Sequence, residues 1–224
     1  MVRKTVCLLI ILVIISFMIS EKPVTLQSIK IPRLKYSGGG DWYNGKTEIP
    51  NLLKYFQEQT GISAEPEDFF IEPDDSRIFN YPFIFVTGHG NISFNEIEIK
   101  NLRSYLLTGG FLYVDDDYGL DKPFRRELER IFPEFELVEL DKNHIIFNCY
   151  FKFPDGLPKI HKHDGKPPQA FGLFDDKGRM MVFYTYETNI SDGWDSPGVH
   201  NNPEDLRETA LKMGVNIIMY ALTH

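Results

Sequence analysis

The chain has 224 residues, enough for one domain with a sizeable core, and 42% of its residues are hydrophobic, as in globular proteins. It carries 32 acidic and 24 basic side chains, for a formal net charge of −8. Binding to phosphate backbones needs clustered Lys and Arg, and the sequence contains no basic stripe. We therefore expect no nucleic-acid partner.

The first residues have the pattern of an export signal. Arg3 and Lys4 precede an apolar run, VCLLIILVIISFMI, that ends before Glu21. A positive start followed by such a run is typical of a secretory signal peptide, and the run is short for a bilayer span. Met18 is bulky for its place near the expected cleavage site, so an uncleaved anchor is the alternative. The predicted division is a signal peptide or N-terminal anchor at 1–20, a linker at 21–28 and a single domain at 29–224.

Strand-like and helix-like patterns alternate through the first two thirds of the chain. Short apolar runs predict strands, and apolar residues spaced three and four apart predict helices. The predicted order is strand 29–36, helix 47–60, strand 69–71, strand 83–86, helix 94–106, strand 111–114, helix 122–132 and strand 135–140. Such alternation implies crossover connections and a parallel sheet with helices on both faces.

Two helix ends carry specific signals. Gly61 predicts the end of the first helix. Ser93 and Glu96 have the spacing of a capping box, so they predict the start of the second helix, with Ile97 on its buried side.

The last third of the chain has a different pattern. AFGLFDDKGRMMVFYTY, residues 170–186, reads as two strands joined by a turn at 176–178, which adds an antiparallel hairpin to the sheet. Pro203 begins a final helix with Ala210, Met213 and Ile217 on one stripe. The predicted fold class is α/β, with a mostly parallel sheet and an antiparallel hairpin extension.

Two loops with unusual side chains follow neighbouring apolar strands. TGHGN follows FIFV, and DDDYG, which begins at Asp115, follows FLYV. Ligands of an open parallel sheet bind outside the carboxyl ends of its strands, so we expect His89 and the aspartates to lie there together. Adjacent carboxylates repel and need a compensating group. In the alternative interpretation, Asp115 accepts backbone hydrogen bonds while Asp116 and Asp117 face water.

Four segments resemble a bacterial family, the domain of unknown function family 4159. They are PRLKYSGGGDWY, FVTGHGNISFNEIEIKNLRSYLLTGGFLYVDDDYG, NHIIFNCYF and NISDGWDSP. The resemblance implies a three-layer Rossmann-like domain, flavodoxin-like or similar to class I glutamine amidotransferases, often exported or membrane-attached. It implies no established reaction.

The residues exclude the thiol chemistry of such amidotransferases. Those enzymes place a cysteine on a tight G-x-C-x-G turn after a strand, with a histidine as its base. No Cys, Ser or Thr occurs between Val114 and Leu120, and Cys149 stands in FNCYF without a glycine turn. Once residues 1–20 are removed, Cys149 is the only cysteine, which also excludes an intramolecular disulfide and a cysteine-rich zinc site.

Two catalytic alternatives remain for the aspartate triplet. Asp115 or Asp116 is a candidate acid–base partner of His89. The second alternative is a site for a divalent metal ion, with Asp115, Asp117 and His89 as ligands. The HKHD stretch, 161–164, is a source of further ligands. No cofactor other than this metal is indicated, because the calcium-loop, P-loop and dinucleotide motifs are absent. The Asp-x-Asp pattern also occurs in nucleotide-sugar glycosyltransferases and aspartyl phosphatases, but the chain is small for the first, and Tyr118 replaces the small residue or threonine of the second.

Further residues are candidates for ligand binding. Glycines on both sides of His89 let backbone amides approach a ligand, although a tight turn explains them equally. The loop tryptophans can stack on a sugar ring while nearby aspartates bind hydroxyls, or they can fold back as plugs over the sheet. The candidates are Gly88, Gly90, Asp117, Tyr118, Trp194, Asp192, Asp195, Trp42 and Asp41.

These features favour a binding function over catalysis. We expect an exported, amidotransferase-like module, periplasmic, secreted or anchored by its N-terminal segment, that binds a small molecule, a glycan or a protein. The alternative is a metal-assisted or acid–base hydrolase that uses residues 115–117 with His89.

Overall fold

The computed structural model describes residues 28–224. The predicted signal peptide or anchor, at 1–20, lies outside the described residues. Within residues 28–224, no helix combines the length and the apolar character needed to span a bilayer.

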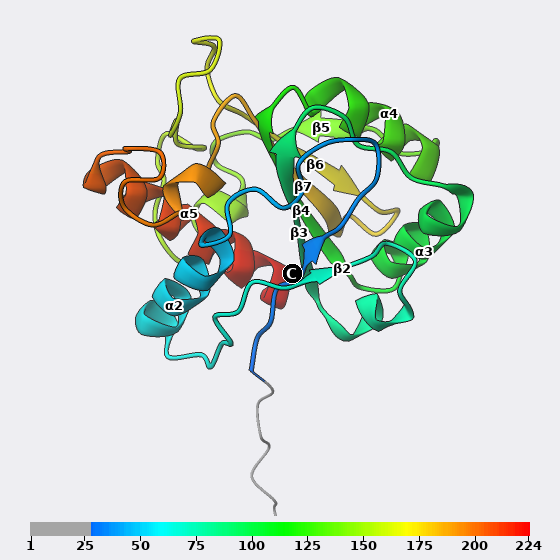
Figure 1. Ribbon diagram of the computed structural model, residues 1–224, viewed down its shortest axis with the longest axis horizontal. Helices are drawn as coiled ribbons and strands as arrows, with labels where there is room; N and C mark the ends of the chain where they lie inside the picture. Colours follow the sequence, from blue (N-terminus) through cyan, green and yellow to red (C-terminus); the bar gives the residue numbers. More distant parts are fainter. Residues whose placement is uncertain (1–27) are drawn as a thin grey trace, which may run out of the picture.

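A seven-stranded sheet crosses the described part of the chain in the order β2-β1-β3-β4-β7-β6-β5 (Figure 1). Neighbouring strands are parallel, except that β6 runs antiparallel to both β7 and β5. The predicted α/β class with a mostly parallel sheet is therefore confirmed. The strands are β1 (Arg33–Leu34), β2 (Phe70–Ile71), β3 (Phe83–His89), β4 (Phe111–Tyr118), β5 (Leu137–Glu139), β6 (Gln169–Phe174) and β7 (Met180–Tyr186).

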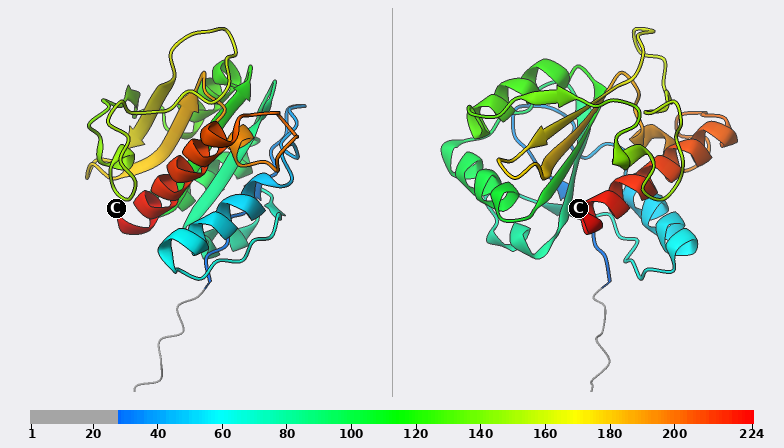
Figure 2. Two further views of the ribbon diagram at one scale, coloured as in Figure 1. Left: turned by 90° about the vertical axis from the view of Figure 1, so that its left-hand side faces the viewer. Right: turned by 180° about the vertical axis from the view of Figure 1, so that it is seen from behind.

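Helices lie on both faces of this sheet (Figure 2). One core contains side chains of α2 and α5, and the other contains side chains of α3 and α4. Because successive side chains of a strand point to opposite faces, β3 contributes Phe83 and Phe85 to the first core and Ile84 and Val86 to the second. The helices are α2 (Glu48–Thr60), α3 (Glu96–Leu107), α4 (Asp121–Ile131) and α5 (Glu204–Thr223).

The capping box of α3 differs from the predicted one. Asn95, not Ser93, accepts hydrogen bonds from the first-turn amides, and the Glu98 side chain accepts the Asn95 N–H at 2.7 Å. Ser93 instead forms an isolated bridge with Ser37, which keeps the chain extended up to the helix. The predicted cap is wrong by two residues, and Ile97 is 67% exposed rather than buried.

Strands β3 and β4 are longer than predicted. The predicted ends lie at residues 86 and 114, but the strands pair through Thr87↔Asp115 and Gly88↔Asp116, and a bulge precedes His89↔Tyr118. The aspartate triplet therefore lies within a strand and not in the loop after it. Strand alternation then decides which way each carboxylate points.

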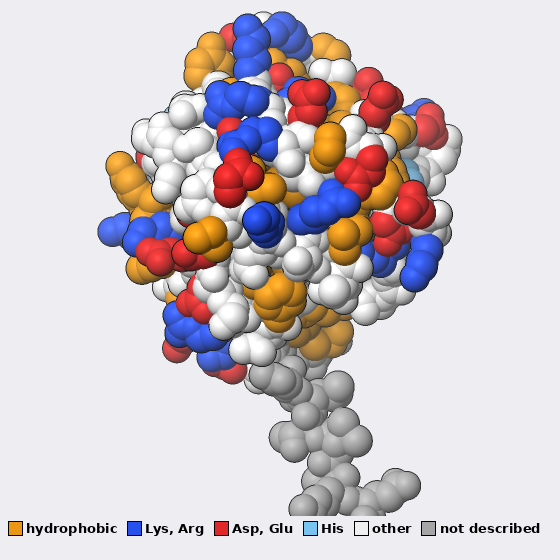
Figure 3. Space-filling model, turned by 90° about the vertical axis from the view of Figure 1, so that its right-hand side faces the viewer, with side chains coloured by type: hydrophobic (Ala, Val, Ile, Leu, Met, Phe, Trp, Pro, Cys, Tyr) orange, Lys and Arg blue, Asp and Glu red, His pale blue; other side chains and the backbone are white. Residues whose placement is uncertain are grey.

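Charges of both signs are interspersed on the face shown in Figure 3, where acidic and basic side chains lie next to each other. Ion pairs also join exposed side chains of the described residues, such as Arg130 and Glu96 at 2.8 Å. Exposed pairs of this kind contribute little to stability.

Candidate functional site

Alternation along β4 divides the aspartate triplet between the two faces of the sheet. Asp115 and Asp117 point toward the core that contains α2 and α5, whereas Asp116 points toward α4 and accepts the Leu120 N–H at 2.7 Å. All three carboxylates are at most 5% exposed, so the expectation that Asp116 and Asp117 face water is wrong. Among the described residues, no hydrogen bond or ion pair joins Asp116 to His89.

Asp115 is a fully buried hydrogen-bond acceptor. It accepts from the backbone N–H of Ser191 at 2.7 Å and from the hydroxyl of Thr185 at 2.5 Å. Burial raises its pKa, and these hydrogen bonds oppose the shift. The expected backbone hydrogen bond is confirmed, and it ties β4 to the turn around η3 (Ser191–Gly193).

His89 is held by two carboxylates. Its Nδ1 lies 3.0 Å from Asp41 Oδ2 and 3.0 Å from Asp117 Oδ2. Carboxylates on this side favour the tautomer with the proton on Nδ1, which leaves the Nε2 lone pair of the half-exposed ring available. Burial and, next, the charge of Asp192 raise the pKa of Asp117 to about 6, while His89 opposes the rise.

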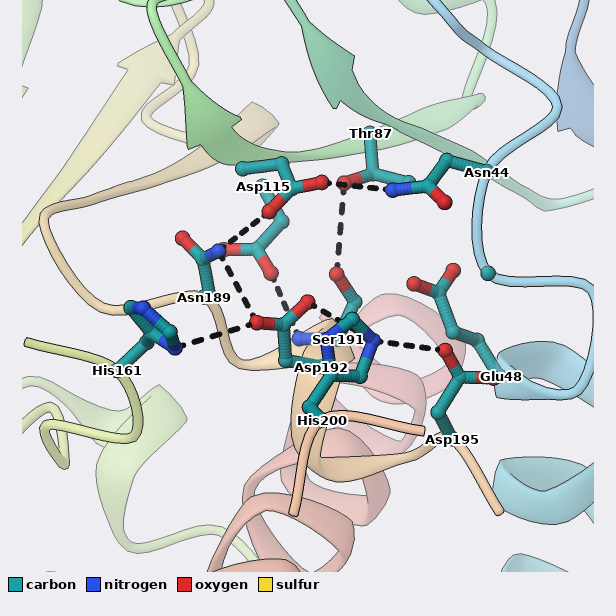
Figure 4. A network of polar contacts seen from close by, with 12 residues as sticks. Asn44, Glu48, Thr87, Asp115, His161, Asn189, Ser191, Asp192, Asp195 and His200 are labelled. Atoms are coloured by element: carbon teal, nitrogen blue, oxygen red, sulfur yellow. Dashed lines mark hydrogen bonds and ion pairs between the residues drawn. The ribbon is translucent and has the colours of Figure 1, made fainter. Parts of the chain in front are cut away.

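Asp192 is the centre of a second cluster (Figure 4). Its carboxylate lies 3.4 Å from His200 Nε2 and 3.6 Å from His161 Nδ1, and it accepts from Asn189 Nδ2 at 3.2 Å. His200 Nε2 also lies 3.0 Å from Asp195. Burial raises the pKa of Asp192 to about 6, against the effects of His200 and Asn189.

Asn189 joins the two clusters. Its side-chain nitrogen, Nδ2, donates to Asp117 as well as to Asp192. Its side-chain oxygen, Oδ1, contacts the Nε2 atom of His163. Asn189 has a φ of +49° and Glu187 a φ of +60°, a left-handed conformation that costs free energy in residues other than glycine. Such strain concentrates at functional sites because surrounding contacts must maintain it.

Together these groups line a cavity of about 550 Å³, here called the histidine cavity. It contains four imidazoles from three separate segments at the carboxyl ends of the parallel strands. In residues 28–224, no group of three or more His, Cys, Asp or Glu side chains is arranged to hold a metal ion. The cavity is lined by Asn44, His89, Asp117, Tyr118, His161, His163, Asp164, Asn189, Asp192 and His200.

One protein family matches nearly all of this domain. The model of a domain of unknown function, DUF4159, matches residues 30–222. The chain belongs to this family. The match confirms the resemblance that the glycine–histidine and triple-aspartate segments predicted, and no curated protein matches the chain. Because the family description states no activity, the chemistry has to come from the site.

Trp194 and Asp195 support the site from outside the cavity. Trp194 is 1% exposed and packs against Phe85 and Tyr113, at centroid distances of 5.5 and 5.8 Å, so it is a plug and has no free face for a ligand. Asp195 accepts from the Thr47 hydroxyl at the start of α2. Both residues fix the loop that carries Asp192.

Three other candidates also lie outside the histidine cavity. Trp42 packs on Phe70 at a centroid distance of 5.1 Å. Gly88 has a φ of +136°, and a Cβ there would lie 2.4 Å from the hydroxyl of Tyr36, so close packing requires this glycine. Gly90 donates its N–H to a β4 carbonyl at 3.1 Å.

Sequence patterns assigned no role to three further residues, Asn44, Asn189 and His200. Asn44 donates to Asp117 at 2.9 Å from the loop after β1. His200 follows the Trp194 segment in a loop rich in Asp, Gly, Ser and Pro, and its composition is the only signal that could have pointed to it.

Asp116 makes stability depend on pH. Burial raises its pKa to about 7, and its hydrogen bond with Leu120 opposes the rise, whereas an unfolded Asp titrates near 3.9. The folded chain thus binds this proton more tightly, so the contribution of Asp116 is present at low pH and lost as pH rises through about 7. We expect the free energy of unfolding of Asp116→Asn, relative to that of the native chain, to rise by on the order of 2 kcal/mol when the pH is raised from 5 to 8. Urea unfolding at the two pH values measures this change.

The control for this experiment is Asp176→Asn, an exposed aspartate in the turn between β6 and β7. Its unfolding curve should follow that of the native chain at both pH values. Equal pH dependence of Asp116→Asn and the native chain would contradict the prediction.

Proposed function

We propose that residues 30–222 form an amidotransferase-like domain that lacks thiol chemistry and binds a small polar ligand in the histidine cavity. The observation that carries this proposal is the cavity itself, because its side chains converge from strand ends and separate loops and are held in place by one another. The strand order β2-β1-β3-β4 supports a Rossmann-like, flavodoxin-type comparison. In that fold, ligands bind between the first and third strands, where the loops carrying Asn44 and His89 meet.

The position of Cys149 supports a function without thiol catalysis. Its Sγ contacts the backbone carbonyls of Asn216 and Ile146, at 3.3 and 3.8 Å, and it does not line the histidine cavity. Burial raises the pKa of Cys149, which disfavours the reactive thiolate.

The lining favours a hydroxyl-rich ligand such as a sugar or part of a glycan. Imidazole, amide and carboxyl groups offer both donors and acceptors, as hydroxyl groups require. None of the described residues that line the cavity is Lys or Arg, so a phosphate or a carboxylate finds no permanently cationic side chain. The export pattern at residues 1–20 supports an extracytoplasmic location, where glycans are available.

Thermal-shift measurements with a panel of mono- and disaccharides test this function. One class of sugar should raise Tm by several degrees, roughly 3–6 °C at saturating concentration. His89→Ala and Asp192→Asn should abolish the shift. His224→Ala, which removes a histidine outside the cavity, should retain it. A shift that persists in both cavity variants would place the ligand elsewhere.

A hydrolase is the second candidate, and the geometry of His89 favours it. An imidazole with Nδ1 on two carboxylates and Nε2 free can activate a water molecule or bind a divalent metal. Chromogenic glycosides, esters and phosphoesters, each with and without Zn²⁺ or Mn²⁺, separate the two functions. Turnover that falls about 10²- to 10⁴-fold in His89→Ala would establish the enzyme. A sugar-induced shift without turnover would establish the binding module.

A further inference from the structure

A second cavity of about 460 Å³ adjoins the histidine cavity. The two share Tyr118, His163 and Asp164, and the rings of Tyr118 and His163 are stacked at 5.4 Å with an interplanar angle of 6°. This stacked pair is therefore the boundary between them. We call the second space the tyrosine cavity, because Tyr118 and Tyr186 both line it.

Asp116 is a buried carboxylate of the tyrosine cavity. The residue is 3% exposed and lines the cavity, on the face of β4 opposite to Asp115 and Asp117. Its Oδ1 accepts the Leu120 N–H at 2.7 Å. Among the described residues, its Oδ2 has neither a hydrogen-bond partner nor a cation within ion-pair distance.

The other acidic groups of this lining all have cationic partners. Asp121 pairs with Arg125 at 2.6 Å, Glu187 with Lys159 at 3.3 Å, and Asp164 with Lys166 at 3.5 Å. The one basic side chain that lines the cavity, Lys122, is exposed and forms no ion pair among the described residues. Asp116 is thus the one carboxylate of the lining without a cationic partner among the described residues.

A small organic cation matches these surroundings. The buried carboxylate supplies the counter-charge, and the faces of Tyr118 and Tyr186 can make cation–π contacts. Pro123 supplies apolar surface for the carbon chain beside the charge. An anionic ligand would meet four acidic side chains instead.

We propose that the tyrosine cavity binds an organic ammonium group, that of a free amine or of a lysine side chain, with Asp116 as its counter-ion. The proposed counter-ion lies on the face of the sheet opposite to the carboxylates of the histidine cavity, although the two cavities share the wall formed by Tyr118, His163 and Asp164. An ammonium ion would fill the one position in the lining where a carboxylate has no cationic partner among the described residues.

The titration of Asp116 gives the binding a pH dependence. Burial raises its pKa to about 7, against the Leu120 hydrogen bond, whereas an alkylammonium group stays protonated up to about pH 10. Affinity should therefore rise by roughly tenfold from pH 6 to pH 8, in proportion to the ionised fraction of Asp116. The ionisable groups that interact electrostatically with Asp116 or line its cavity are Asp115, Asp117, Tyr118, Asp121, Lys122, His163, Asp164, Tyr184, Tyr186 and Glu187.

The test is a titration with n-butylammonium chloride and with the tripeptide Gly-Lys-Gly, followed by the amide signal of Leu120 in ¹H–¹⁵N NMR spectra. Both probes carry the ammonium group, and the tighter one identifies the source as a free amine or a lysine side chain. Asp116→Asn keeps the acceptor for the Leu120 N–H and should bind about tenfold more weakly or worse. Lys122→Gln removes a repelling charge at the rim and should bind about two- to threefold more tightly.

Asp176→Asn, in the exposed turn between β6 and β7, is the matched control and should bind as the native chain does. Binding that is equal in Asp116→Asn and the native chain at pH 8 would overturn the proposal. So would a Leu120 signal that does not move at saturating probe, or equal binding of neutral n-pentanol. Because Lys122→Gln changes only an exposed side chain, it keeps the test valid if Asp116→Asn unfolds.

Discussion

Trp194→Ala is expected to lower the free energy of unfolding by about 3–5 kcal/mol, because it removes a large, fully buried side chain from a closed core. The indole packs against Phe85 and Tyr113, and its Nε1 donates to the carbonyl of Ala210 at 2.9 Å. The substitution leaves a cavity against α5 and removes the indole donor to the carbonyl of Ala210 in that helix. Urea unfolding monitored by far-UV circular dichroism measures the loss.

Trp194→Phe is the matched comparison, since it keeps an aromatic ring and loses only part of the volume and the Nε1 donor. It should lose less than half as much stability as Trp194→Ala. A loss below about 1 kcal/mol for Trp194→Ala would contradict the core position of the indole. Because the same loop carries Asp192, the alanine variant should also weaken any ligand of the histidine cavity.

Arg33→Met is expected to destabilise the chain by a similar amount, about 3–5 kcal/mol, through a different mechanism. Arg33 and Glu48 are each 2% exposed and pair at 3.1 Å, and Arg33 also contacts Asp68 and the carbonyl of Gly45. Burial raises the pKa of Glu48 well above its usual range, and Arg33 opposes that rise. Without Arg33, the buried carboxylate has no counter-charge and must bind a proton.

The double variant Arg33→Met with Glu48→Gln tests this mechanism. Removing both charges should recover more than half of the loss, because the cost comes from an unpaired buried charge. Glu208→Gln, in the exposed pair with Lys212, should cost only about 0.3–0.5 kcal/mol. Additive losses in the double variant would show that the two side chains act independently, against this prediction.

Local patterns predicted the elements but not all of their ends. Gly61 ends α2 in the left-handed conformation, with a φ of +73°, as a C-terminal glycine should. The cap of α3 was misplaced because two overlapping signals, at Ser93 and Asn95, compete, and a bridge to Ser37 decides between them. Apolar runs also placed the ends of β3 and β4 too early, because pairing between the strands continues through their polar residues.

The candidate site was predicted only in part. That His89 and Asp117 meet follows from two parallel neighbouring strands. The roles of His161, Asn189 and His200 do not follow from any local pattern. Those of Asn189 and His200 depend on β7 lying beside β4, which brings the chain after Tyr186 to the same edge of the sheet. His161 reaches this edge through its backbone N–H, which donates to the carbonyl of Thr188 at 2.8 Å.

The sequence by itself determined the α/β class, the parallel pairing of the first strands and the edge of the sheet where polar groups collect, since strand and helix periods and glycine turns are local properties. Only the tertiary structure decided that Asp115 is an internal support, that Asp117 holds His89 and that Asp116 faces a separate cavity. It also decided that Arg33, on the predicted strand 29–36, is buried with Glu48. The reason is physical: burial and pairing of a charge depend on neighbours that are distant along the chain.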